Sequence, residues 1–171
     1  MADQRQVARE KVISAQTSAA SGTNVRATIS RIADPNGEVV SLVLADELLV
    51  YLDVNTALVG TAPTMDIYLQ MAVVPNPNPA TDAHWTDIAA FAQVTTALVE
   101  KLLALPYTQV GAATGAGRAA ANARDRTHAT ITADTMYPTH WGDQIRIVEK
   151  MGGTVTTQAI YDVTITAIVR K

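Results

Sequence analysis

Residues 47–74 read ELLVYLDVNTALVGTAPTMDIYLQMAVV and decide the fold. Apolar side chains occupy every second position, first at Leu48, Val50, Leu52 and Val54 and then at Ile67, Leu69, Met71 and Val73. Because successive side chains of a β-strand point to opposite faces, each alternation predicts a strand with one buried face. Residues 60–64, Gly-Thr-Ala-Pro-Thr, have the composition of a turn. The stretch therefore predicts a half-buried antiparallel β-hairpin.

Further alternating stretches predict strands on both sides of this hairpin. They cover residues 25–32, 38–44, 143–150 and 157–170. Turns are predicted at 34–37 (Asp-Pro-Asn-Gly) and at 151–154 (Met-Gly-Gly-Thr), because glycine and asparagine permit positive φ angles.

The segments between these strands are less regular. Residues 84–91 fit either a strand or one helical turn, and residues 93–105 fit either a helix or a strand. Prolines at positions 75, 77 and 79 predict an extended loop. We therefore expect a mainly β protein, folded as an antiparallel β-sandwich or a jelly-roll-like domain.

Two segments without such patterns are predicted to be extensions. Residues 1–25 are polar and are expected to form an N-terminal arm, and residues 26–171 the β-sandwich domain. A long loop at about 107–139 is inserted in that domain, and loops of this length are usually functional or disordered. Because polar tails are flexible in isolated proteins, we expect neighbouring subunits to order both extensions.

Basic side chains in the extensions are the candidate partner-binding residues. They are Arg5, Arg9 and Lys11 in the arm and Arg118, Arg124 and Arg126 in the loop. Arginines without interleaved aromatic residues more often form ion pairs between subunits than contacts with nucleic acid. We expect them to pair with carboxylates of a neighbouring subunit.

The composition excludes several classes of protein. The absence of cysteine excludes disulfides, thiolate metal sites and cysteine nucleophiles. With 48% apolar and 17% charged residues, disorder throughout is not expected. The net charge of −3 argues against general nucleic-acid binding. We expect no secretory signal and no membrane helix, because the first residues are polar and no apolar run approaches about 20 residues.

The sequence does not predict an enzyme, a metal site or a cofactor site. Three histidines are scattered along the chain, at His84, His128 and His140. A carboxylate pair for glycoside hydrolysis could be drawn from Asp66, Asp82 and Asp87, but aspartates at strand edges are more often solvated. Residues 111–117 are glycine-rich like a phosphate-binding loop and lack its lysine.

Two histidines directly precede tryptophan, in the pairs His84–Trp85 and His140–Trp141. Such a pair could frame a stacking pocket for a sugar ring. Alternatively, the tryptophan anchors the end of the sheet core and the histidine lies at its solvated rim. We expect the structural role, because tryptophan is mostly buried and the pair carries no chemistry by itself.

The order of several motifs resembles a group of virion structural proteins of tailed bacteriophages. In that group a strand ending in Leu-Asp-Val precedes a Gly-Thr-x-Pro-Thr turn and an alternating strand. A Trp-x-Asp-apolar-x-x-Phe segment, a strand with a central arginine and a Gly-Gly-Thr turn follow. The matching segments here are 52–54 (LDV), 60–67 (GTAPTMDI), 85–91 (WTDIAAF), 93–95 (QVT), 142–147 (GDQIRI) and 152–154 (GGT).

The match covers roughly residues 47–103 and 137–171. This chain departs from the group in its longer connection at 105–137 and in its 75–79 loop.

The resemblance implies a non-enzymatic virion protein, made in the cytoplasm of a bacterial host. We favour a capsid decoration or cement protein that binds the major capsid protein shell through its arm and loop, as a homo-oligomer or high-copy assembly. One alternative is a head–tail connector or tail completion protein that forms a ring. A second alternative is a carbohydrate-binding β-sandwich that uses Trp85 and Trp141.

Overall fold

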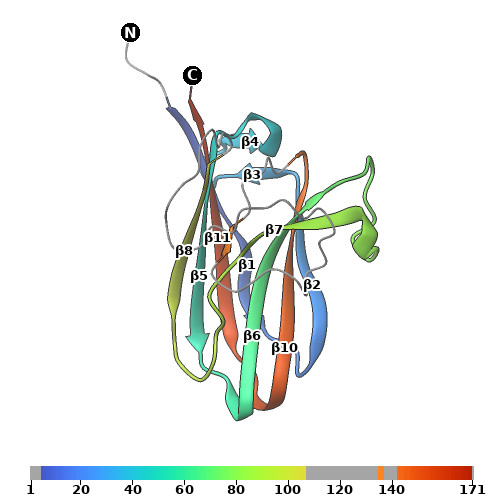
Figure 1. The fold of residues 1–171 in the computed structure, drawn as a ribbon. Coiled ribbons are helices and arrows are strands. Elements are labelled where there is room, and N and C mark those ends of the chain that lie inside the picture. The colour runs from blue at the N-terminus through green and yellow to red at the C-terminus, as the bar shows by residue number, and fades with distance from the viewer. Residues whose placement is uncertain (1–4, 107–134, 137–141, 171) are drawn as a thin grey trace.

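Two antiparallel β-sheets pack face to face in the computed structural model, which describes residues 5–106, 135–136 and 142–170 (Figure 1). The first sheet has the strand order β1 (Arg5–Thr17), β11 (Ile160–Arg170), β5 (Glu47–Thr56) and β8 (Glu100–Pro106). The second has the order β2 (Gly22–Ile29), β10 (Ile145–Thr157), β6 (Val59–Ala72), β7 (Trp85–Ala90) and β9 (Thr135–Met136). The prediction of a mainly β, antiparallel sandwich is confirmed.

Shorter elements complete the described part of the chain. The hairpin of β3 (Arg31–Ala33) and β4 (Val39–Ser41) lies at one end of the sandwich, at the top of Figure 1. Two single 3₁₀ turns, η1 (Leu42–Leu44) and η2 (Asp82–His84), precede β5 and β7.

The core lies between the two sheets and is built from the alternating apolar positions. Leu48, Val50 and Leu52 on β5 are fully buried, as are Ile145 and Ile147 on β10. The sequence prediction of the inward face of β5 is therefore confirmed. On β6 the buried alternation stops before the strand ends, so that Val73, just beyond it, is half exposed.

The predicted hairpin at 47–74 is wrong in its pairing. β5 pairs with β11 and β8, whereas β6 pairs with β10 and β7, so the two strands lie in opposite sheets. Only Ala57 and Leu58 connect them, and Leu58 is fully buried. Gln158 and Ala159 join β10 to β11 in the same way. Periodicity shows which side chains are buried, but not whether the next strand lies beside the first or across the core.

The two predicted glycine turns are wrong as well, because they lie inside long paired strands. Gly60 is part of β6 and Gly153 is part of β10, with φ angles of 156° and 70°. A Cβ atom on Gly60 would overlap the carbonyl group of Thr154, and one on Gly153 would overlap that of Ala62. Glycine is required here because two backbones approach closely at a bulge, where the register of the β6–β10 pair shifts.

β1 and β2 contain most of the residues that were expected to form an N-terminal arm. β1 pairs with β11 from end to end, and β2 pairs with β10. The arm prediction for residues 1–25 is therefore wrong wherever these strands run. Ala8 and Ile13 provide the buried side chains of β1. Register shifts lie on both sides of Ile13. They move the inward-pointing residues from even to odd positions, so the strand has no regular alternation in its sequence.

The remaining predictions have mixed outcomes. The turn at 34–37 is confirmed, with the N–H of Gly37 donating to the carbonyl of Asp34 at 2.9 Å. Residues 84–91 contain strand β7, and the ambiguous segment 93–105 contributes to strand β8 and forms no helix. The predicted long loop at 107–139 lies outside the described residues, except for the two that form β9.

Candidate partner-binding surface

Residues 73–84 connect β6 to β7 and stand out from the sandwich on the right of Figure 1. We call this segment the β6–β7 loop. The extended loop predicted from its prolines is confirmed, because proline cannot donate a hydrogen bond to a ladder and the chain leaves the sheet. The loop is the most prominent departure from the regular sandwich in the described part of the chain.

Arg146 of β10 fixes the β6–β7 loop to the second sheet. Its side chain is fully buried on the face opposite Ile145 and Ile147. Nη2 donates a hydrogen bond of 2.7 Å to Oδ1 of Asp82, and Nη1 donates to the carbonyl of Pro79. One buried guanidinium therefore binds two points of the loop, in the fork geometry that only arginine supplies.

The same guanidinium also contacts the two strands from which the loop springs. Nε donates a hydrogen bond of 2.6 Å to Oε1 of Gln70 on β6. The guanidinium lies 4.9 Å from the ring centroid of Trp85 on β7, within the range of a cation–π contact. The amide of Gln70 in turn donates a hydrogen bond of 2.6 Å to the buried carboxylate of Asp87.

Asn78 organises the interior of the loop. Its backbone N–H donates to Nδ1 of His84 at 2.9 Å, and its carbonyl accepts a bond of 2.9 Å from Nε1 of Trp85. Its side-chain oxygen accepts from the N–H of Ala80 at 2.9 Å. Since Nδ1 of His84 is an acceptor, the neutral imidazole carries its proton on Nε2. These bonds preorganise the loop without any ligand.

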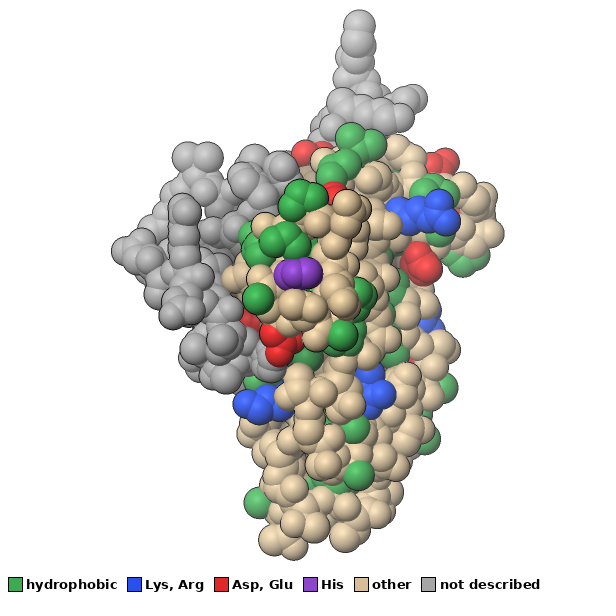
Figure 2. All heavy atoms as spheres, turned by 90° about the vertical axis from the view of Figure 1, so that its right-hand side faces the viewer, with side chains coloured by type: hydrophobic (Ala, Val, Ile, Leu, Met, Phe, Trp, Pro, Cys, Tyr) green, Lys and Arg blue, Asp and Glu red, His purple; other side chains and the backbone are tan. Residues whose placement is uncertain are grey.

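The surface of the loop is mostly apolar. Figure 2 looks onto this side of the molecule and shows hydrophobic side chains gathered around the histidine. Val73 is 50% exposed, and Pro75, Pro79, Ala80 and Ala83 are also exposed. An ordered, apolar and projecting loop is suited to binding another protein surface.

The structural interpretation of the His84–Trp85 pair is confirmed for the burial of Trp85 but is wrong about its place: the ring lies on the Arg146 face of the second sheet, outside the core between the sheets. Trp85 is only 3% exposed, with Arg146 over its ring, and His84 lies half-buried at the rim. Trp85 therefore offers no open face on which a sugar could stack. The second pair, His140–Trp141, lies outside the described residues.

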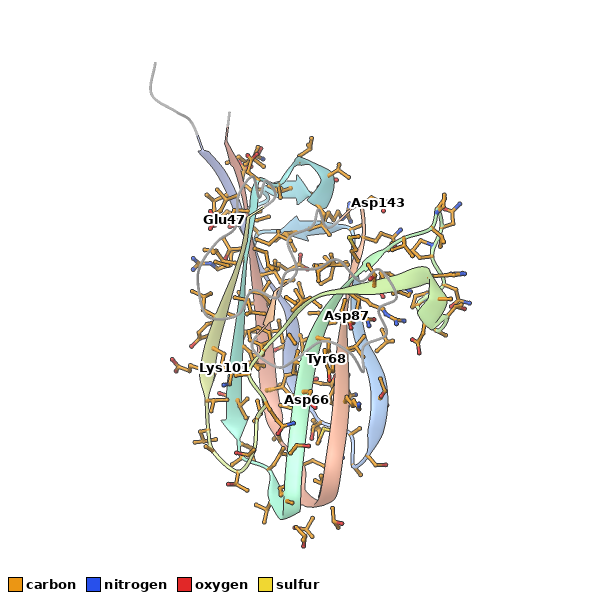
Figure 3. All side chains as sticks on the ribbon, in the orientation of Figure 1. Glu47, Asp66, Tyr68, Asp87, Lys101 and Asp143 are labelled. Carbon is orange, nitrogen blue, oxygen red and sulfur yellow. The ribbon has the colours of Figure 1, made fainter. Side chains whose placement is uncertain are left out.

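The three aspartates considered for glycoside hydrolysis serve separate contacts. Asp82 pairs with Arg146, Asp87 is buried and bound to Gln70, and Asp66 accepts a hydrogen bond of 2.9 Å from Gln93. Asp66 and Tyr68 are two residues apart on β6 and lie on the same face of it, and Asp87 lies near them on β7 (Figure 3). The pKa of Tyr68 is raised to about 12, mainly by burial and further by the carboxylates of Asp66 and Asp87.

Only some of the predicted partner-binding residues lie in the part of the chain that the structure describes. Arg9 and Lys11 lie on the exposed face of β1, where Arg9 donates to Thr166 at 3.1 Å and Lys11 pairs with Asp162 at 3.1 Å. Arg5 is the first residue of β1. The loop arginines Arg118, Arg124 and Arg126 lie outside the described residues.

Sequence reasoning missed a second buried polar cluster, centred on Glu149. Its fully buried carboxylate accepts bonds from Arg26 at 2.6 Å, from the N–H of Ala19 at 2.8 Å and from Tyr161 at 2.8 Å. The alternation along the strand could have revealed it. Every second residue of a strand points to the same face, so Glu149 points inward with Ile145 and Ile147. A buried carboxylate needs such partners, and Arg26 and Tyr161 come from different sheets.

The described ranges offer neither a metal-binding group nor a membrane-spanning helix. Residues 5–106, 135–136 and 142–170 contain no group of three or more histidine, aspartate or glutamate side chains that could hold a metal ion. No helix in the same ranges has the length and apolarity that a membrane crossing requires.

Comparison of the chain with protein-family models, with curated proteins and with solved structures finds no match. The β6–β7 loop and the resemblance in sequence are therefore the grounds for assigning a function.

Proposed function

We propose that this chain is a non-enzymatic structural protein of a tailed-phage particle, and that it decorates the capsid shell by binding major capsid protein subunits. The β6–β7 loop is the shell-binding element in this proposal. It replaces the N-terminal arm in that role, because residues 5–17 are committed to the first sheet as β1.

One observation carries the proposal. Trp85 and Asp87 belong to one motif of the phage resemblance and Arg146 belongs to another, sixty residues further along the chain. In the fold all three meet around Gln70, where they hold the base of the β6–β7 loop. This convergence supports the proposal, because it gives a physical reason for motifs that otherwise share only their order and spacing.

The preorganisation of the loop supports a binding role. A loop that is already cross-linked by Arg146 and Asn78 loses little conformational entropy when a partner covers it. Its exposed apolar side chains can be buried against a shell, and repetition of the shell subunit would add avidity if the protein binds in several copies.

The proposal is tested by binding to particles. The gene for this chain is deleted from the phage that carries it, and the mutant particles are purified. Purified protein is then added to these particles. We expect wild-type protein to bind, and Val73→Asp to bind at least about tenfold more weakly, because an unpaired carboxylate would be buried in the contact.

Val59→Asp is the matched control. Val59 is 52% exposed against 50% for Val73, and it begins β6 at the far end from the loop. Equal binding of both variants would refute the role of the loop, and failure of the wild-type protein to bind any particle would refute the virion function. A copy number that matches a single ring, rather than the shell, would favour the connector alternative.

A further inference from the structure

The outer face of the first sheet, opposite the core, carries an exposed apolar band. Leu49 and Tyr51 on β5 lie directly across from Ala104 and Leu102 on β8. Leu102 is 61% exposed, and Leu49 and Tyr51 are half-buried. Because Leu48, Val50 and Leu52 point into the core, this band is a second apolar surface on the other side of the same strand.

A cation that forms no ion pair with any described carboxylate lies on one side of this band. Arg9 of β1 is in the same cross-strand row as Thr166 and Leu49. It is exposed and donates one hydrogen bond, to Thr166, and it forms no ion pair within the described ranges.

Carboxylates lie on another side of the band. Asp162, Asp53 and Glu100 face one another directly across β11, β5 and β8. Asp162 is bound by Lys11, Asn55 and the N–H of Ala15, and this last bond above all lowers its pKa. Asp53 and Glu100 form no ion pair with any residue that the structure describes, and like charges in opposed positions destabilise a sheet.

Both edges of this sheet are unsuited to pairing with another strand. β1 contains two register shifts and a positive φ angle of 46° at Ala15. On β8, Lys101 shares the core-facing positions of Leu103 and Leu105. Bulges and inward-pointing charges are the features that block edge-to-edge association, so the open face is the available surface.

We infer that the outer face of the first sheet binds the same face of a second copy of this chain. A two-fold axis that lies in the interface and passes between Leu49 and Tyr51 brings Arg9 of each copy to Asp53 of the other. It also packs Leu49 against Tyr51 of the second copy. The contact is self-complementary, as a two-fold interface must be, and the strands of the two faces cross steeply, as in orthogonal sheet packing.

The charges explain why the occupant is a second copy. The surface provides its own counter-charges, with Arg9 on one side and Asp53 and Glu100 on the other, separated by apolar side chains. Pairing across the axis relieves the repulsion within the carboxylate row and covers the apolar band at the same time. The inference does not rest on the proposed function, because it concerns the purified chain alone.

Sedimentation equilibrium of the full chain tests the inference, from about 1 µM to about 1 mM, which spans the affinities of weak dimers. We expect a reversible dimer that Arg9→Glu and Asp53→Arg each weaken at least about tenfold, because each places like charges in contact. The double variant Arg9→Glu/Asp53→Arg should restore the wild-type affinity to within about threefold, since it exchanges the charges of the pair.

Arg31→Glu is the control, because Arg31 is an exposed arginine on β3, away from this face, and should leave the dimer unchanged. Circular dichroism and thermal unfolding confirm that each variant is folded. A wild-type chain that is monomeric at the highest concentration overturns the inference. A dimer weakened equally by Arg31→Glu, or a double variant as weak as the single ones, overturns it as well. None of these results depends on particle binding.

Discussion

The hydroxyl of Tyr161 donates a hydrogen bond of 2.8 Å to Oε2 of Glu149, and both side chains are fully buried. Tyr161 belongs to the first sheet and Glu149 to the second, so this bond spans the core. Oε1 of the same carboxylate accepts from Arg26 and from the N–H of Ala19, which lies in the connection between β1 and β2. One carboxylate therefore links the start of the chain to its end.

Removal of the Tyr161 hydroxyl should destabilise the fold. Tyr161→Phe leaves a buried carboxylate oxygen without its donor, and we expect a loss of about 1–3 kcal/mol in the free energy of unfolding. Urea denaturation followed by circular dichroism measures the loss. Tyr51→Phe is the control, because Tyr51 lies on the outer face of the first sheet, and it should have no comparable effect. Equal effects of the two variants would argue against a special role for the Glu149 contact.

Stability should fall at alkaline pH. Burial raises the pKa of Tyr161, and burial first of all raises the pKa of Tyr68 from 10.0 to about 12. Above about pH 10 the unfolded chain loses phenolic protons that the folded chain retains, so the unfolded state is favoured as pH rises. The stability due to the neutral form of Tyr68 is complete below pH 10 and is lost as pH rises to about 12.

Denaturant titrations at a series of alkaline pH values test this dependence. Tyr68→Phe should lose stability less steeply above pH 10 than the wild-type chain, because one of the coupled protons is gone. Identical slopes for the two proteins would show that Tyr68 ionises at its ordinary pKa in the fold.

Removal of the Arg146 guanidinium should release the β6–β7 loop and leave the sandwich in place. In Arg146→Met, Asp82 and the carbonyl of Pro79 no longer accept hydrogen bonds from the second sheet. We expect hydrogen exchange of the Thr81 and His84 amides to accelerate at least about tenfold, with the core amides of β5 and β11 little changed. Arg31→Met, at an exposed arginine on β3, is the control. Unchanged exchange in the loop would mean that the Asn78 contacts hold it alone.

Alanine should not be tolerated at the bulge between β6 and β10. Gly153→Ala combines a positive φ angle with overlap of the Ala62 carbonyl, whereas Gly22→Ala has a similar φ angle of 79° and open space around it. We expect Gly22→Ala to cost about 1–2 kcal/mol for the backbone conformation alone, and Gly153→Ala to cost clearly more. Thermal unfolding of both variants gives the comparison. Equal losses would mean that the opposing backbone can move aside.

The sequence predicted the elements of this fold better than their partners. Apolar alternation located β5, β6 and β11 and the buried face of β5, because a half-buried strand requires that pattern. It could not show that β5 and β6 lie in opposite sheets, since either arrangement buries the same side chains. The sequence did not indicate β1, because its bulges interrupt the pattern in which every second residue points inward. Gly60 and Gly153 have the composition of turns, although the fold uses them for close backbone approach within strands.

The candidate site was only partly visible in the sequence. Trp85, Asp87 and Arg146 were noted as members of motifs, and the prolines marked the loop. Their contact could not be predicted, because it depends on β10 pairing with β6 across a long separation in sequence. The Glu149 cluster had a signal in its parity, yet the identity of its partners again depends on sheet topology.

The pairing of β1 with β11 has a consequence for synthesis of the protein. The two strands lie side by side, so that β1 begins and β11 ends at the same end of the sandwich (Figure 1). The ladder between β1 and β11 therefore cannot form until β11 has been synthesised. Closure of the first sheet therefore depends on contacts between segments that are far apart in the sequence, and such contacts form slowly.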